Sequence, residues 1–91
     1  MLISWAPSGR KDILHLLNYY IEQGQKDVGQ MLLDRIIKSI SRLSSFPNSG
    51  REGRLKETRE LILPDLPYIV VYRVKDHVEI VRILHSRKQY P

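Results

Sequence analysis

The last third of the chain constrains its fold most strongly. Three stretches, residues 58–63, 68–74 and 77–85, are rich in the β-branched and aromatic residues that favour extended strands. Two prolines in residues 64–67 force a turn after the first stretch, and residues 75–76 fit a hairpin tip after the second. We therefore predict three consecutive strands in this part of the chain.

Helical periodicity dominates the first half of the chain. Residues 2–6 predict a short first strand. Apolar residues then recur at helical spacing over residues 10–23, and again from residue 27 to residue 44 or 45, which predicts two amphipathic helices. Ser8 and Asp27 are the residues that we expect to cap these helices.

A loop separates the helices from the strands. Residues 46–54 contain Pro, Asn, Ser and two glycines, a composition typical of loops. Arginines and glutamates are interleaved here, so that their charges nearly cancel locally. The predicted order is β-α-α-β-β-β, an α+β fold in one domain spanning residues 1–91, with the two helices forming a hairpin.

Alternation along the predicted strands assigns their two faces. On the strand 68–74, one face carries Val70, Tyr72 and Val74, and the other carries Ile69, Val71 and Arg73. On the strand 77–85, one face carries Val78, Ile80 and Leu84, and the other carries Val81 and Ile83. Because the last strand is apolar on both faces, we expect it to be central in the sheet. We expect Arg73 on the open face, away from the helices.

Charge and composition narrow the classes of partner. The formal net charge of +5 favours a negatively charged partner, either nucleic acid or an acidic protein. The chain has no cysteine, which excludes disulfides and thiolate metal sites and fits a reducing cytoplasm. We expect no signal peptide and no membrane span, because no apolar run approaches the required length.

The arginines of the strand region are the first candidates for function. Burying an unpaired charge is costly, so each arginine must be paired or must face water or an acidic partner. Arginines lining a surface could bind phosphates or carboxylates in bidentate geometry. The alternative is that they pair across strands with Glu60 or Glu79, and we expect this for Arg82. Arg87 and Lys88 lie just past the last strand, where we expect exposure and partner contact.

His85 is the histidine with the most promising neighbours. It ends the last strand, beside Arg87 and near Tyr90, and such a trio could in principle cleave RNA by 2′-hydroxyl attack. The alternative is that His85 packs at the strand end and makes local hydrogen bonds. His15 and His77 have no obvious partner, and no spacing fits a metal site or calls for a cofactor.

Several short motifs, in order, resemble the RelE/ParE superfamily of bacterial toxins, and the ParE branch more than the RelE branch. They are Trp5-Ala6, Gly50-Arg51, Thr-Arg-Glu-Leu at 58–61, Pro-Tyr-Ile-Val-Val-Tyr-Arg-Val at 67–74, Val-Arg-Ile-Leu-His-Ser-Arg at 81–87, and the terminal Tyr90-Pro91. The resemblance implies a helical hairpin packed on a mainly antiparallel sheet. It also implies a cytoplasmic toxin of a type II toxin–antitoxin module that poisons DNA gyrase and is neutralised by a cognate antitoxin in a hetero-oligomer.

On this reading the chain is a binding inhibitor with no catalytic residue, metal or cofactor. The expected target-binding residues are Arg59, Arg73, His85, Arg87, Lys88 and Tyr90. The expected antitoxin-binding residues, on the apolar faces of the helices, are Leu14, Leu17, Ile21, Leu33 and Ile37.

Two alternatives remain open. RelE-like toxins cut mRNA on the ribosome, and here His85, Arg87 and Tyr90 would carry that reaction, although the glutamates of the loop weaken this reading. A relic that binds the antitoxin but poisons nothing is the other alternative.

Overall fold

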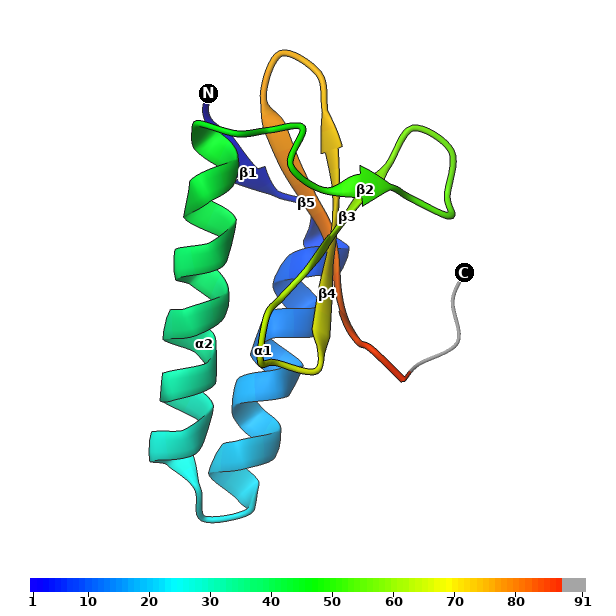
Figure 1. The fold of residues 1–91 in the computed structure, drawn as a ribbon. Coiled ribbons are helices and arrows are strands. Elements are labelled where there is room, and N and C mark those ends of the chain that lie inside the picture. Colours follow the sequence, from blue (N-terminus) through cyan, green and yellow to red (C-terminus); the bar gives the residue numbers. More distant parts are fainter. Residues whose placement is uncertain (88–91) are drawn as a thin grey trace.

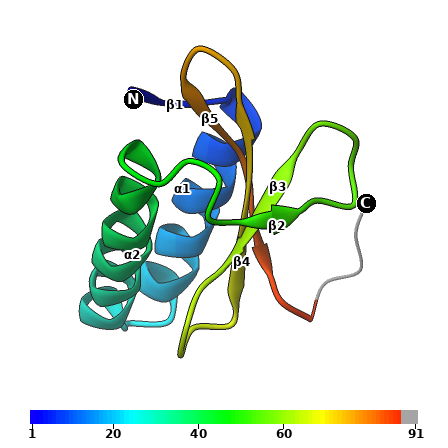
Figure 2. The same ribbon diagram turned by 45° about the horizontal axis from the view of Figure 1, so that its top comes forward.

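The computed structural model describes residues 1–87 and shows a helical hairpin on one face of a five-stranded mixed sheet (Figure 1). The elements are β1 (Ile3–Trp5), α1 (Pro7–Glu22), α2 (Lys26–Ser41), a 3-10 turn η1 (Arg42–Ser44), β2 (Arg51–Glu52), β3 (Arg59–Ile62), β4 (Tyr68–Val74) and β5 (Val78–His85). Both helices lie on the same side of the sheet (Figure 2). The predicted α+β fold is confirmed. Lys88 and Tyr90, two of the expected target-binding residues, lie outside the described residues.

The strand order in the sheet is β1-β5-β4-β3-β2. β1 runs parallel to β5, and the other three pairs are antiparallel. β5 is thus flanked on both sides, as its two apolar faces predict. β2 is a strand where a loop was expected: it has only two residues, and Gly50 and Gly53 on either side give the segment a loop composition.

The predicted helix caps are wrong. α1 begins at Pro7, whose fixed φ suits a first helical position, so Ser8 lies inside the helix. The hydroxyl of Ser8 instead donates to the Val81 carbonyl oxygen at 2.6 Å and ties α1 to β5. α2 begins one residue before Asp27, so that this carboxylate lies in the first turn. There its negative charge interacts favourably with the positive end of the helix dipole.

The core lies between the helices and the inner face of the sheet. Ile36 and Leu43 from the helical side meet Tyr72 and Ile80 from the sheet, and all four side chains are fully buried. α1 approaches β5 closely at Gly9, where a Cβ would lie 2.6 Å from the Ile80 carbonyl oxygen. This contact fixes the position of α1 against the sheet.

A β-bulge changes the predicted faces of β5. Tyr72 of β4 pairs with Ile80, but Val71 pairs with Arg82, so one residue of β5 is extra. Ile83 therefore joins the helix-facing core together with Ile80, instead of lying opposite it, and Leu84 does not belong to that cluster. Strict alternation fails here because a bulge leaves no clear signal in a run of apolar residues.

None of the helices within residues 1–87 is long and apolar enough to cross a membrane.

Candidate functional site

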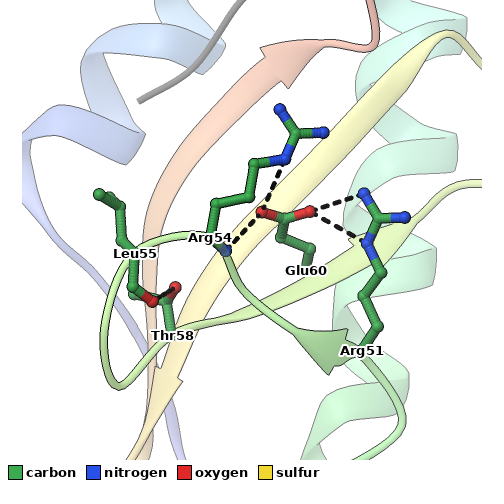
Figure 3. A network of polar contacts seen from close by, with 5 residues as sticks. All are labelled: Arg51, Arg54, Leu55, Thr58 and Glu60. Atoms are coloured by element: carbon green, nitrogen blue, oxygen red, sulfur yellow. Dashed lines mark hydrogen bonds and ion pairs between the residues drawn. The ribbon is translucent and has the colours of Figure 1, made fainter.

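A buried carboxylate organises the β2–β3 hairpin. The side chain of Glu60 is 1% exposed, and Arg51 donates to its Oε1 from two nitrogens, at 3.1 and 2.7 Å (Figure 3). The backbone N–H of Arg54 donates to Oε2 at 3.1 Å, and Nε of Arg54 lies 3.8 Å from the same oxygen. We call these three residues the Glu60 clasp.

The environment of Glu60 keeps it ionised. Burial alone would raise the pKa of its carboxyl group, but the hydrogen bonds from Arg51 and from the Arg54 backbone, with the charges of both arginines, outweigh burial. The pKa therefore lies below its ordinary value of 4.5. A charged carboxylate with several donors joins β3 to β2 and to the chain beyond β2.

Further hydrogen bonds shape the loop that follows β2. The Gly53 backbone N–H donates to the Thr58 carbonyl oxygen at 2.8 Å. The Thr58 hydroxyl donates to the Leu55 carbonyl oxygen at 2.6 Å (Figure 3). Glu57 adopts a left-handed φ of 63° within the same turn. The loop thus has a defined conformation and projects from the sheet with Arg54 and Lys56 on it (Figure 1).

Arg59 uses its guanidinium group inside the protein. Its Nη1 donates to the Gly50 carbonyl oxygen at 2.8 Å and to the Asn48 carbonyl oxygen at 3.3 Å. The Tyr72 hydroxyl holds the same loop, since it accepts from the Gly50 N–H and donates to the Pro47 carbonyl oxygen, both at 2.8 Å. The guanidinium group of Arg59 therefore stabilises residues 47–50 and is already engaged within the chain.

Arg73 and Arg82 are both paired: Arg73 follows the cross-strand alternative to target binding, and Arg82 has a partner that was not expected. Arg73 lies opposite Glu79 across β4 and β5, with Nε 3.2 Å from Oε1. The geometry is that of an ion pair and not of a hydrogen bond, because this Nε has no hydrogen-bond partner among the described residues. Arg82 pairs with Asp12 of α1 at 2.7 and 3.2 Å, so the expectation that it pairs with Glu60 or Glu79 is wrong.

His85 and Arg87 lie together at the other end of the β4–β5 ladder. Both are exposed, and the Arg87 backbone N–H donates to Nδ1 of His85 at 3.2 Å. The His85 ring also contacts Tyr68 edge-on, with 5.6 Å between ring centroids. His77 does have a partner, contrary to expectation: its Nδ1 lies 2.7 Å from Oδ1 of Asp76, which lowers the pKa of that exposed carboxyl group.

The four predicted target-binding residues that the structure describes do not form one surface. Arg73 pairs with Glu79 at one end of the β4–β5 ladder, and His85 pairs with Tyr68 at the other. The five residue steps between Tyr68 and Arg73 correspond to about 17 Å of strand. Only His85 and Arg87, among the four expected residues that are described, are exposed side chains close to each other.

The predicted antitoxin-binding residues divide by exposure. Leu14 and Ile21 of α1 are 52% and 45% exposed and lie two turns apart on one face, and Ile37 of α2 is 42% exposed. Leu17 and Leu33 are half-buried, and Leu33 packs against the core. The helical hairpin thus presents exposed apolar side chains above a packed layer.

The Glu60 clasp was missed at the sequence level. Its signal is modest: Arg51, Arg54 and Glu60 are spaced across a short hairpin, and β2 was not predicted there. The burial of Glu60 depends on the register that places it opposite Arg51.

Comparison with known proteins agrees with the fold and extends it. The family described as "ParE toxin of type II toxin-antitoxin system, parDE" matches residues 3–90. A Sinorhizobium fredii protein named "Putative toxin Y4kP" is 43% identical over 72 residues, which cover 79% of this chain and 75% of that protein.

Among solved structures, one titled "Chromosomal ParDE TA system from P. aeruginosa" superposes with a TM-score of 0.82 at 20% identity, covering 93% of this chain and 95% of the other. The structural similarity shows a shared fold, and the family match spans nearly the whole chain. This chain belongs to the ParE toxin family of type II toxin–antitoxin systems.

Proposed function

We propose that this protein is a ParE-type toxin that inhibits DNA gyrase by binding it, and that a cognate antitoxin neutralises it. The family match over residues 3–90 carries the proposal. Arg59, Arg73 and Arg82 all contact groups of the same chain. We therefore propose a smaller target-binding surface than the sequence suggested. His85 and Arg87 are the described residues best placed to contact gyrase.

A supercoiling assay with purified gyrase tests the target. We expect the wild-type chain to inhibit supercoiling, and Arg87→Ala to weaken inhibition more than Arg73→Ala does. Arg10→Ala is the matched control, because it removes another exposed positive charge, from the start of α1. Normal supercoiling at saturating wild-type protein would reject gyrase as the target.

The RNA-cleaving alternative has its own readout. His85 accepts a hydrogen bond from the chain itself, yet its ring remains exposed and could still exchange protons. If the protein cut mRNA, induction would produce breaks in translated transcripts that His85→Ala abolishes. Intact transcripts together with arrested supercoiling would favour inhibition of gyrase.

The antitoxin would bind across the helical hairpin. The exposed apolar side chains of Leu14, Ile21 and Ile37 could receive the apolar face of an amphipathic segment, and a net charge of +5 favours acidic residues on that segment. Leu17 and Leu33 would form the floor beneath them. This proposed antitoxin surface does not include His85 or Arg87.

A negative charge introduced on the hairpin tests the antitoxin surface. Ile37→Glu should abolish co-purification with the product of the neighbouring antitoxin gene, because the added charge would be buried in the complex. Val28→Glu is the matched control: Val28 is 38% exposed, and nine positions from Ile37 along α2 it lies on the opposite flank of the helix. Equal loss of binding in both variants would contradict this location.

A further inference from the structure

A cleft of about 440 Å³ opens between α1 and the end of the ladder at which Tyr68 pairs with His85. It is lined by Tyr19, Tyr20 and Tyr68, three of the five tyrosines of the chain, and by His15 and His85, two of its three histidines. We call it the tyrosine cleft. Tyr19 is 57% exposed, so its ring is not used to fill the core.

The aromatic walls of the cleft are held in place. Tyr19 and Tyr20 meet edge to face, with 5.2 Å between centroids, and Tyr68 meets His85 in the same way. α2 also packs closely against Tyr20, since a Cβ added to Gly29 would lie 2.9 Å from the Cβ of Tyr20. Rings that are already fixed lose little conformational entropy when a ligand binds.

Two polar groups in the cleft are set as donors. Nδ1 of His85 accepts the Arg87 N–H, so the neutral imidazole carries its hydrogen on Nε2. Burial first, and then the charge and hydrogen bonding of Tyr20 and the charge of Tyr19, raise the pKa of Tyr68 to about 12, so that its hydroxyl, which also interacts with Tyr20, keeps its proton at neutral pH. Arg87 is not a lining residue, but it is exposed and its backbone contacts His85, so its positive charge lies two residues beyond this end of the cleft.

The charge balance decides what kind of ligand the cleft suits. Asp12 is the one carboxylate among its lining residues, and both of its oxygens are occupied: Oδ2 accepts from Arg82 and from the Ile83 N–H at 2.7 and 2.9 Å, and Oδ1 accepts from Arg82 at 3.2 Å. A cation enclosed by the rings would therefore meet no free carboxylate among the described residues that line the cleft. A planar aromatic group that carries a negative charge fits the rings, the donors and Arg87 together.

We propose that the tyrosine cleft binds a nucleotide, with the base against the tyrosine rings and the phosphate at His85 and Arg87. Bases stack on aromatic side chains without strict sequence preference, and arginine suits phosphate oxygens. The nucleotide could be free or part of a single strand, because both present the same base and phosphate. This inference goes beyond gyrase inhibition and does not depend on it.

Titration of the purified chain with adenosine monophosphate, followed by NMR, tests the proposal. We expect the imidazole signals of His15 and His85 to shift and those of His77 to stay. Tyr19→Ala should weaken binding about tenfold, within the range of about 1–3 kcal/mol for one stacked base. Tyr19→Phe keeps the ring and should bind as the wild type does, and Phe46→Ala removes a 67% exposed ring elsewhere and should have no effect.

A second arm uses a short single-stranded oligonucleotide and distinguishes the two sources. Binding of the oligonucleotide but not of the mononucleotide, with the same dependence on Tyr19, supports a strand as the source. The affinity for the oligonucleotide should fall with salt at a log–log slope of about −0.7 for each phosphate that the protein neutralises. The inference fails if Tyr19→Ala binds like the wild type, if shifts centre on Arg51 and Arg54, or if only an acidic aromatic peptide binds in the cleft.

Discussion

The β2–β3 hairpin and the tyrosine cleft use polar side chains in opposite ways. In the hairpin, the charged groups of Arg51, Arg54 and Arg59 contact a carboxylate or carbonyl oxygens of the same chain. In the cleft, the side chains of His85 and Tyr19 are exposed although their rings are positioned by neighbours. The hairpin uses charge for stability, whereas the cleft keeps ordered groups available at the surface.

The difference shows why arginines within strands are weak indicators of a binding site. A strand arginine has neighbours at fixed distances on adjacent strands, so a carboxylate there can pair with it. A residue beyond the strand end, such as Arg87, has fewer such neighbours. Changes in the two regions should therefore affect stability and binding separately.

The largest effect on stability is expected for Glu60→Ala in the hairpin. Removing one partner of a buried ion pair typically costs about 3–5 kcal/mol, and because Arg51 is 49% exposed we expect about 3 kcal/mol here. Chemical denaturation measures the change. Glu52→Ala, which removes an exposed carboxylate from the same hairpin, is the control and should change stability by less than about 0.5 kcal/mol.

Acid should weaken the same contact. Because the pKa of Glu60 is lower in the folded protein than in the unfolded chain, its stabilising contribution is complete above pH 4.5 and is lost as the pH falls through the folded value. Glu60→Gln cannot titrate, so its stability should vary less with pH in this range. Parallel acid profiles for the two proteins would mean that the clasp does not control acid stability.

A smaller effect is expected for Tyr72→Phe, which removes a hydroxyl but keeps the buried ring. The Gly50 N–H and the Pro47 carbonyl oxygen would each lose a hydrogen bond of 2.8 Å, at a cost of about 1–2 kcal/mol. Amide hydrogen exchange should rise in residues 48–50. An unchanged exchange rate there would show that Arg59 alone holds this loop.

The fold followed from the sequence because it rests on local periodicity. The helical spacing and the alternation in β4 were enough to predict both helices and three of the four strands after them. β2 was missed because two residues between glycines have no period, and the bulge in β5 depends on its pairing with β4. Local patterns specify elements, but they do not specify register.

The candidate sites followed from the sequence only in part. Arg82 and Asp12 are 70 positions apart, and their contact depends on how α1 lies against β5. His15 likewise meets His85 in one cleft only after the helix packs on the sheet. Arginine positions were visible in the sequence, but their partners were not.

Tyr68→Phe tests the cleft in alkali. The pKa of Tyr68 is raised from 10.0 to about 12 in the folded protein, so its contribution to stability is present below pH 10 and is lost as the pH rises through about 12. In a spectrophotometric titration, the variant should lack the tyrosine ionisation near pH 12. At neutral pH we expect a loss of at most about 1 kcal/mol, and a final ionisation step that persists in the variant would assign it to another tyrosine.

The smallest effect is expected for the Arg73–Glu79 pair, which tests whether the ladder end near the hairpin depends on its surface charges. The two side chains are 40% and 36% exposed, so water screens their attraction, and their contact is not a hydrogen bond. A double-mutant cycle with Arg73→Ala and Glu79→Ala should give a coupling energy of about 0.2–1 kcal/mol that falls as salt is added. A coupling energy above about 2 kcal/mol that does not fall with salt would instead mean that this pair stabilises the fold as the Glu60 clasp does. Arginine pairing within the chain would then contribute to stability at this end of the ladder as well.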